Sequence, residues 1–316
     1  MNCLCCGKPL GDEEYGSGWH QSCIRKFYGF EKLPSINIDD DTLIALAEES
    51  SGKGVTVTGV QKKLSLHLVS DSESPRLTLV GYPAGYILKP PTREYEALPE
   101  AEHLVMSMAD AVGIRTVPHA LISGKDGYSY ISKRIDRIID GSSVTKLAME
   151  DFCQLDMRLT EDKYHGSCER LAKIISTYSS KEGLDMSELF MRLVFCFITG
   201  NSDMHMKNFS LIENEIGTSE YTLSAAYDLL PVNIIVPEDT EETAIPINGK
   251  KNNIRRKDFL KFAENCGISQ KAAEKIITGL IKKRDLFITM CSTSLLPDHM
   301  KTTFSELITS RINCLM

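Results

Sequence analysis

The spacing of apolar residues predicts that the first half of the chain is rich in strands. Val60, Leu64, Leu66 and Leu68 fall at even spacing, which is the period of a strand with one buried face. Shorter apolar runs, one of them followed by a Gly-Tyr-Pro-Ala-Gly turn at 81–85, indicate further strands. These are expected at 77–80, 86–88, 119–122 and 128–133. A helix-like stretch at 41–49 and a Gly/Ser/Thr segment at 50–58 come before them.

Beyond Arg137 the chain is predicted to be mostly helical. An earlier helix begins at Pro99 and stops before Gly113, because proline suits a first turn and glycine the residue after the last one. Asp185 can cap a buried helix over 186–199. A hairpin is expected from strands at 209–212 and 221–225, and further helices from Lys257 onward. This order predicts an α+β fold, a layout that many unrelated proteins share.

Composition and charge narrow the possible functions. The 316 residues include 36 basic and 43 acidic side chains, giving a net charge of −7. Direct binding to nucleic acid is therefore not expected, although a local basic patch or a basic partner could bring the chain to DNA. The best apolar stretch, 189–199, is short and contains Arg192, so it cannot span a bilayer. Met1 precedes a Cys-rich stretch instead of an apolar signal, which predicts a cytoplasmic protein.

Residues 200–209, Gly-Asn-Ser-Asp-Met-His-Met-Lys-Asn-Phe, carry the most informative chemistry. Asp203 and Asn208 are five residues apart, as in the catalytic loop of protein kinases. There the aspartate takes the proton of the acceptor hydroxyl and the asparagine holds Mg²⁺. Asp228 follows the predicted hairpin and would be the main Mg²⁺ ligand. Each aspartate alone is typical of a turn or a helix cap, but together with Asn208 they favour a kinase site.

Phosphate groups also require a cation, and Lys89 ends the predicted strand at 86–88. Its ammonium could reach the phosphates of ATP as a point charge. Glu102 shares a face of the helix from Pro99 with apolar residues, and a buried carboxylate needs a cationic partner. A Lys89–Glu102 pair is therefore expected. The alternatives are a solvated lysine at a strand end and a partly exposed glutamate.

The N-terminal segment contains two short chelating pairs, Cys3-x-x-Cys6 and His20-x-x-Cys23. Four such ligands are the pattern of a structural, tetrahedral Zn²⁺ site, and a piece of about 30 residues has too small a core to fold without such a staple. A metal-free packed appendage is the alternative. Cys5 is left over and could compete for the metal. The six later cysteines show no ligand spacing and are expected to pack as small apolar residues.

In order and rough spacing, these motifs resemble those of HipA-like kinases, the toxins of bacterial toxin–antitoxin systems. The matching stretches are Gly59–Leu64, Lys89, Ala101-Glu102-His103, Lys133-Arg134-Ile135-Asp136-Arg137, Glu150-Asp151-Phe152-Cys153-Gln154, Asp203–Ser210 and Tyr227–Leu230. Lys133 replaces a hinge glutamate of the family, and Ala101 replaces an asparagine. The separate N-terminal subdomain of the long toxins is not recognisable, so a short form is expected.

The resemblance implies a two-lobed kinase-like fold with a β-rich N-lobe, an all-helical C-lobe and a small zinc-binding appendage. The expected boundaries are 1–34 for the appendage, 35–137 for the N-lobe and 138–316 for the C-lobe. The resemblance also implies a phosphate-covering loop that includes Thr58, Gly59, Gln61 and Lys63. In that loop Thr56 and Thr58 stand where the family autophosphorylates; both could instead be strand threonines chosen for β-propensity.

Further roles follow from the same resemblance. Lys133, Ile135 and Asp136 would form the hinge that binds the nucleoside of ATP, although Asp136 could simply pair with Arg134 or Arg137. His205 would brace the catalytic loop and Lys207 would contact the γ-phosphate; either could equally be scaffolding.

The function implied is that of an ATP- and Mg²⁺-dependent serine/threonine kinase toxin that phosphorylates a translation-related protein. Its partner would be a HipB-like helix-turn-helix antitoxin, with a small HipS-like protein as a further candidate. DNA would then be reached only through the antitoxin, and no membrane is involved. Two alternatives remain, a catalytically silent kinase-fold corepressor and a kinase acting on a small molecule or lipid. The complete set of Lys89, Glu102, Asp203, Asn208 and Asp228 argues against the first.

Overall fold

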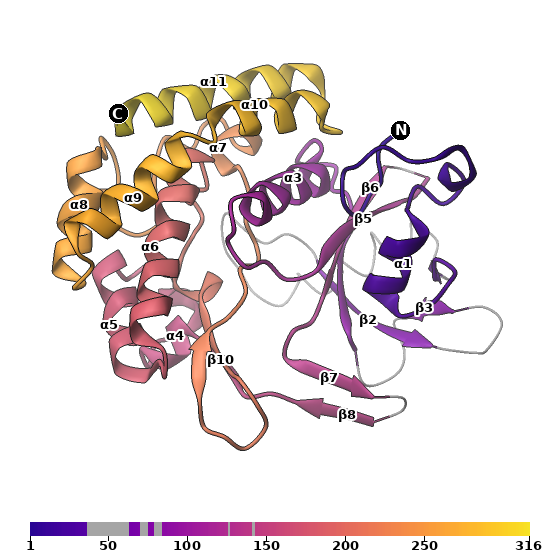
Figure 1. The fold of residues 1–316 in the computed structure, drawn as a ribbon, viewed down its shortest axis with the longest axis horizontal. Coiled ribbons are helices and arrows are strands. Elements are labelled where there is room, and N and C mark those ends of the chain that lie inside the picture. Colours follow the sequence, from indigo (N-terminus) through magenta and orange to yellow (C-terminus); the bar gives the residue numbers. More distant parts are fainter. Residues whose placement is uncertain (37–62, 70–74, 79–83, 126, 141–142) are drawn as a thin grey trace. The chain divides into compact units, whose positions relative to one another are not determined.

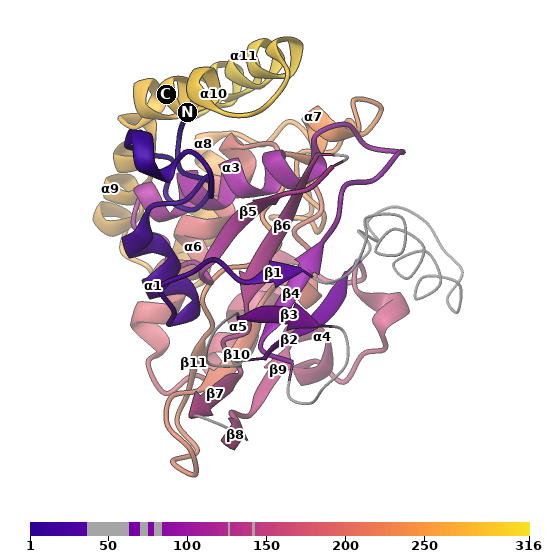
Figure 2. The same cartoon turned by 90° about the vertical axis from the view of Figure 1, so that its right-hand side faces the viewer.

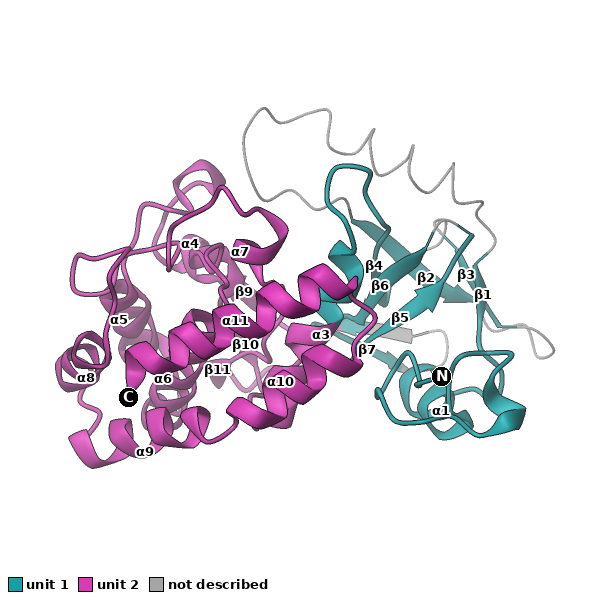
Figure 3. Cartoon of the chain, turned by 90° about the horizontal axis from the view of Figure 1, so that it is seen from above, with its two compact units in different colours: residues 1–103, 117–145 teal, residues 104–116, 146–316 magenta. Residues whose placement is uncertain are grey.

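A computed structural model describes residues 1–36, 63–69, 75–78, 84–125, 127–140 and 143–316. The chain forms two compact units (Figure 3). Unit 1 contains residues 1–103 and 117–145, and unit 2 contains residues 104–116 and 146–316. Helix α3 (Leu98–Ala111) begins in unit 1 and ends in unit 2.

A six-stranded sheet with the order β1-β3-β2-β4-β6-β5 forms the centre of unit 1 (Figure 2). Its strands are β1 (Ser35–Ile36), β2 (Leu64–Val69), β3 (Arg76–Thr78), β4 (Tyr86–Lys89), β5 (His119–Ser123) and β6 (Tyr128–Lys133). Leu64 of β2 pairs with Leu88 of β4, and Leu88 pairs with Ile131 of β6. All three side chains are buried, as the alternating pattern of the sequence predicts.

The N-terminal segment packs on the edge of this sheet. It contains a short 3₁₀ turn, η1 (Asp12–Glu14), and helix α1 (Gln21–Tyr28). The backbone N–H of Leu121 in β5 donates to the carbonyl of Leu4 at 2.8 Å, and the buried indole of Trp19 donates to the carbonyl of Leu121 at 3.1 Å. These contacts cover an edge strand whose backbone groups would otherwise be unpaired.

Unit 2 is mainly helical and is built around helix α6 (Glu182–Ile198), which packs against α5 (Cys168–Tyr178), α9 (Gln270–Ile281) and α11 (Asp298–Leu315) (Figure 1). Eleven residues of α6 are buried, including the whole run from Arg192 to Ile198, because the helix is apolar nearly all round. The remaining helices are α4 (Phe152–Leu155), η2 (Thr160–Asp162), η3 (Met206–Asn208), α7 (Val232–Ile235), α8 (Arg256–Asn265) and α10 (Arg284–Thr293). Among the described residues, none of the helices is long and apolar enough to cross a membrane.

Several elements differ from the sequence prediction. Strands β9 (Met149–Asp151), β10 (Ser210–Glu213) and β11 (Tyr221–Leu223) form a small sheet in unit 2, which is therefore not all-helical. The hairpin β10–β11 was predicted, whereas β9 and the pair β7 (Arg137–Asp140) and β8 (Ser143–Lys146) were not. These strands are three or four residues long, too short to show a reliable period.

Asp185 does not cap α6, because the helix begins three residues earlier, at Glu182. Its carboxylate instead accepts hydrogen bonds from the hydroxyl of Ser179 at 2.6 Å and from the N–H of Leu223 at 2.7 Å. Asp185 thus ties α6 to strand β11. The helix expected at 41–49, the segment at 50–58 and most of the turn at 81–85 lie outside the described residues.

Candidate active site

The predicted catalytic loop follows directly from the buried end of α6. Gly200 has a φ of 66°, a conformation that glycine adopts without strain. Its carbonyl accepts the N–H of Asn233 at 3.0 Å. A Cβ atom at this position would lie 2.5 Å from the side chain of Leu307 in α11, so a larger residue would also have to displace that side chain. The loop is therefore fixed in direction where it leaves the helix.

Asp203 lies on this loop in a network of backbone and side-chain hydrogen bonds. Its N–H donates to the side-chain oxygen of Asn201 at 3.3 Å, and its carbonyl accepts from the amide of Asn208 at 2.9 Å. The hydroxyl of Tyr164 donates to its carboxylate at 2.5 Å. The loop is thus held at both ends, as an oriented catalytic carboxylate requires.

Burial raises the pKa of Asp203 to about 6. The negative charges of Asp228 and Asp239 act in the same direction, whereas the Tyr164 hydrogen bond and the Lys163 ammonium oppose them. The effect of Asp228 shows that the two predicted catalytic carboxylates lie close enough to interact electrostatically, although they are 25 residues apart in the sequence.

Asp228 occupies a strained backbone position with a φ of 55°, which is uncommon for a residue other than glycine and marks many functional sites. Its neighbours hold it there. The hydroxyl of Tyr227 lies 2.5 Å from that of Ser210 and donates to the carbonyl of Lys207 at 3.1 Å. The N–H of Ala226 donates to the carbonyl of Arg115 at 2.6 Å. The Asp228 turn is therefore anchored to the catalytic loop.

His205 and Lys207 have different surroundings on the same loop. The His205 ring is buried and lies edge-on to the ring of Tyr164, with centroids 5.1 Å apart. Burial, together with the Lys163 charge, lowers the pKa of His205 to about 4, so the ring is neutral at neutral pH. The Lys207 ammonium forms an ion pair with Asp151 at 2.7 Å, which connects the loop to the end of β9.

Lys89 and Glu102 form the ion pair that the sequence predicts. The ammonium of Lys89, at the end of β4, donates to Glu102 Oε1 at 2.6 Å. The two side chains are 7% and 0% exposed, and the Lys89 ammonium lies 5.4 Å from the centre of the Tyr130 ring. A charge-assisted hydrogen bond this well buried fixes the position of the ammonium.

The predicted hinge begins at the end of β6 with Lys133. Lys133 and Ile135 are both partly exposed. The carboxylate of Asp136 is bound by the guanidinium of Arg134 at 2.9 and 3.0 Å, and by that of Arg137. Burial alone would raise the pKa of Asp136, but the two guanidinium groups hold it below its usual range. Asp136 therefore pairs with Arg134 and Arg137, which is the alternative role that the sequence allowed for it.

Of the predicted phosphate-covering loop, only Lys63 is described, and its side chain is exposed. Thr56, Thr58, Gly59 and Gln61 lie outside the described residues.

The four predicted zinc ligands converge in the N-terminal segment. The ligand atoms of Cys3, Cys6, His20 and Cys23 all lie within 4.8 Å of one another. The Nε2 atom of His20 lies 2.9 Å from the carbonyl of Pro9, whereas its Nδ1 atom is 3.3 Å from the sulfur of Cys6. Because a carbonyl can only accept, the proton belongs on Nε2 and the lone pair of Nδ1 faces the thiols. Three thiols and one imidazole fit Zn²⁺.

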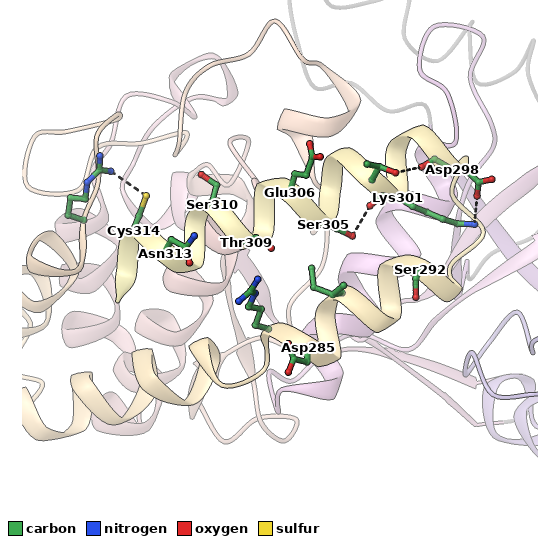
Figure 4. Close-up of a pocket in the computed structure, with 14 residues that line it drawn as sticks. Asp285, Ser292, Asp298, Lys301, Ser305, Glu306, Thr309, Ser310, Asn313 and Cys314 are labelled. Carbon is green, nitrogen blue, oxygen red and sulfur yellow. Dashed lines mark hydrogen bonds and ion pairs between the residues drawn. The ribbon is translucent and has the colours of Figure 1, made fainter.

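A groove with a volume of 1220 Å³ lies between α10 and α11 (Figure 4). Polar side chains of both helices line it, among them Asp285 and Ser292 from α10 and Lys301, Ser305 and Glu306 from α11. None of the predicted site residues that the structure describes lines this groove.

Sequence reasoning missed several residues that hold the catalytic loop, namely Asn201, Tyr164, Lys163, Asp151 and Asp239. Asp239 accepts a hydrogen bond from Ser202 at 2.6 Å. Tyr164 precedes Asp203 by 39 residues and lies in an irregular segment, where neither period nor spacing gives a signal. Only Asn201, two residues before Asp203, stood within the motif itself.

A buried strand lysine paired with a helix glutamate, a loop with Asp203 and Asn208, and an aspartate such as Asp228 after the following hairpin are features of the protein-kinase-like class. The match of a family model defines the group more narrowly. The chain belongs to the HipA-like C-terminal domain family, whose model matches residues 55–285.

Curated relatives and solved structures agree with this assignment. A Haemophilus influenzae protein named "Putative kinase" is 26% identical over 92% of this chain and 90% of its own length. "Putative kinase Y4mE" of Sinorhizobium fredii is 28% identical over 73% of this chain and 55% of its own length.

Among solved structures, HipA of Shewanella oneidensis, determined in complex with HipB and operator DNA, aligns over 88% of this chain and 71% of its own length. The TM-score is 0.71 at 19% identity. The Helicobacter pylori proinflammatory kinase CtkA aligns over 84% of this chain and 92% of its own length, with a TM-score of 0.52 at 13% identity. At these identities the likeness establishes the HipA-like fold.

Proposed function

We propose that this chain is an ATP- and Mg²⁺-dependent serine/threonine protein kinase. The observation that carries the proposal is the catalytic loop of unit 2, in which Asp203 is oriented by Asn208 and interacts with the charge of Asp228. The buried Lys89–Glu102 pair of unit 1 supplies the second requirement of a kinase, a fixed cation for the phosphates of ATP.

Each residue has a role in this proposal. Asp203 accepts the proton of the acceptor hydroxyl, and Lys89, oriented by Glu102, binds the α- and β-phosphates. Asn208 and Asp228 offer the hard oxygen ligands that Mg²⁺ prefers. When bound, the ion neutralises charge on the phosphates. Lys133, Ile135 and Asp136 would form the hinge beside the nucleoside, with Asp136 acting through its arginine pairs.

The proposal extends to regulation of the same activity. Thr56 and Thr58 would be autophosphorylated, and the added charge would repel the phosphates of ATP or displace the loop that contains Gly59, Gln61 and Lys63. Mass spectrometry after incubation with Mg-ATP tests this directly. Unmodified Thr56 and Thr58 in an otherwise active preparation would contradict it.

We further propose that the kinase acts as the toxin of a toxin–antitoxin module. The support is the similarity to HipA, which was determined together with HipB and operator DNA. The partner would be a HipB-like helix-turn-helix protein, and a small HipS-like protein is a second candidate. The substrate would be a protein of the translation machinery, and the active protein would be cytoplasmic.

The N-terminal cysteine and histidine cluster would hold one structural Zn²⁺. Four protein ligands leave no open coordination position, so the ion would stabilise the segment and would take no part in phosphoryl transfer.

The decisive experiment incubates the purified chain with γ-labelled Mg-ATP and a bacterial lysate, next to an Asp203→Asn variant. Label is expected on serine or threonine of one or a few proteins, and only with the wild-type chain. ATP binding without transfer to any protein would favour a silent binding module. Label on a small molecule or lipid would favour a different class of kinase.

A further inference from the structure

The segment 160–167 packs tightly against the catalytic loop. The N–H of Met206 donates to the carbonyl of Lys163 at 3.2 Å. A Cβ atom at Gly166 would lie only 2.5 Å from the sulfur of Met206, so a larger residue there would displace the Met206 side chain. The ring of Tyr164 meets the edge of the His205 ring at 5.1 Å. This segment is therefore built against the residues that carry the proposed chemistry.

Tyr164 uses one oxygen of the Asp203 carboxylate and leaves the other available. Its hydroxyl donates to Asp203 Oδ1 at 2.5 Å, which fixes the rotation of the carboxylate. Within the described part of the chain, Oδ2 accepts no hydrogen bond. A carboxylate that receives the proton of an acceptor hydroxyl needs one oxygen held in place and one open. In Asp203 the Tyr164 hydrogen bond holds Oδ1 in place, and Oδ2 is the open oxygen.

One lysine lies on each of the two segments that meet at Asp203, and the two differ in their ion pairs. Lys207 forms its 2.7 Å ion pair with Asp151, so its charge is already compensated. The ammonium of Lys163 lies 4.8 Å from the centre of the Tyr164 ring, and within the described ranges no carboxylate pairs with it. Its charge acts on both Asp203 and His205. Of these two lysines, Lys163 is therefore the one whose ammonium can bind an anion beside Asp203 without breaking an ion pair seen in the described residues.

We propose that Lys163 and Tyr164 complete the catalytic centre, Lys163 by binding the γ-phosphate and Tyr164 by positioning Asp203. This inference rests on the proposed kinase function. In the reaction, the bond between the acceptor oxygen and the γ-phosphorus forms while the bond from that phosphorus to the β–γ bridging oxygen breaks. ADP leaves, the hydroxyl proton passes to Asp203, and Lys163 offsets the negative charge on the phosphoryl group. Lys207 keeps a structural role.

The first test compares the affinities for Mg-ATP and Mg-ADP by calorimetry. A contact to the γ-phosphate strengthens ATP binding alone, because ADP lacks that group. The Lys163→Met variant is expected to lose about tenfold in its preference for ATP over ADP, the amount that one charge-assisted contact supplies. Its affinity for ADP should stay near that of the wild type. The control is Lys173→Met, which removes the same charge from an exposed position on α5.

The second test separates positioning from folding at Tyr164. The Tyr164→Phe variant keeps the ring packed on His205 and removes only the hydroxyl. Its kcat is expected to fall about tenfold or more with little change in KM for ATP, and its thermal unfolding should match the wild type. A Tyr164→Ala variant should lose kcat further and also lose stability. A merely structural Tyr164 would lower stability and leave kcat of the folded Tyr164→Phe variant intact.

The outcomes distinguish this inference from the proposed function. A wild-type chain that transfers phosphate, combined with an unchanged ATP/ADP preference in Lys163→Met or an unchanged kcat in Tyr164→Phe, overturns the assigned role of that residue alone. A wild-type chain that binds neither nucleotide overturns the proposed function and this inference with it.

Discussion

At the scale of single residues, the energetics of Lys89 and Glu102 depend on each other. A buried ion pair adds little net stability, but removing one partner leaves an uncompensated charge in the interior. Glu102 is fully buried, so Lys89→Met should lower the free energy of unfolding by about 3–5 kcal/mol. Urea denaturation measures this loss.

The matched control is the double variant Lys89→Met with Glu102→Met, in which the stranded charge is gone. It should recover most of the lost stability, while remaining inactive in phosphoryl transfer. If the double variant were as unstable as Lys89→Met alone, the cost would lie in packing around the site and the charge argument would be wrong.

His103 and His119 are half-buried and form a second close pair, with ring centroids 5.1 Å apart. Burial lowers the pKa of His103 to about 4 and that of His119 well below its usual value, where the His103 charge contributes as well. The ring nitrogens of His119 and Nδ1 of His103 are buried without a hydrogen-bond partner in the described structure. Both rings are therefore neutral when folded.

A pH dependence of stability follows from this pair. Above about pH 6.5 the imidazoles are neutral in both the folded and the unfolded chain. As the pH falls from there towards 4, the unfolded chain binds protons first, so the free energy of unfolding should fall by up to about 1.4 kcal/mol per pH unit for each histidine. His119→Phe should show a weaker acid dependence in urea denaturation at pH 7.5 and 5.5. The exposed control His299→Phe should behave like the wild type.

At the scale of elements, long or strongly periodic segments were predictable from the sequence. The pattern located β2, β4, β5 and β6, the helix α3, the hairpin β10–β11 and the helices after Lys257. It missed β9 and the start of α6, because short strands lack a period and Asp185 looks like a cap while serving as a tie to β11. Tertiary contacts that the sequence does not display decided both cases.

In the candidate site, too, residues within a sequence motif were predicted and residues brought in by tertiary contacts were not. Asp203, Asn208 and Asp228 were found because a loop motif and a hairpin place them at fixed intervals. Tyr164 and Lys163 were not found, since they reach Asp203 through a tertiary contact between segments 39 residues apart. Sequence patterns thus located Asp203, Asn208 and Asp228, and the structure added Tyr164, proposed to position Asp203, and Lys163, proposed to bind the γ-phosphate.

The proposed zinc-binding segment contains a residue whose fluorescence can report on the metal. Trp19 is the only tryptophan, it lies in the same segment as the four ligands, and its indole bonds to β5. Purified protein should contain about one Zn²⁺ per chain. Removal of the metal by a chelator should change the tryptophan fluorescence and lower the thermal unfolding temperature, because the segment loses its staple.

Two serine variants test which thiols hold the metal. Cys6→Ser should lose zinc by metal analysis and reproduce the fluorescence change, whereas Cys5→Ser should retain zinc. Folded wild-type protein that contains no metal, prepared without chelators, would contradict the zinc assignment. Zinc content and fluorescence of Cys6→Ser equal to those of the wild type would show that Cys6 is not a ligand.

At the scale of the whole molecule, the net charge of −7 bears on how the chain reaches DNA. Basic side chains that contact the phosphates of a duplex release counterions, and this release supplies much of the binding affinity. An acidic chain gains little affinity in this way. The purified chain alone is therefore expected not to retard a short DNA duplex at physiological salt in an electrophoretic mobility assay. Addition of the proposed helix-turn-helix partner should produce a retarded complex that contains both proteins.

The Asp203→Asn variant separates two proposed roles of the chain, joining the DNA complex and arresting growth by phosphoryl transfer. Asp203 is oriented within the catalytic loop by Asn201, Asn208 and Tyr164, so replacing one carboxylate oxygen removes the proton acceptor and leaves the rest of the fold in place. The variant should join the retarded complex as the wild type does, yet fail to arrest growth when expressed without the partner. Growth arrest by Asp203→Asn at wild-type level would mean that toxicity does not depend on phosphoryl transfer, and the kinase-toxin proposal would then be wrong.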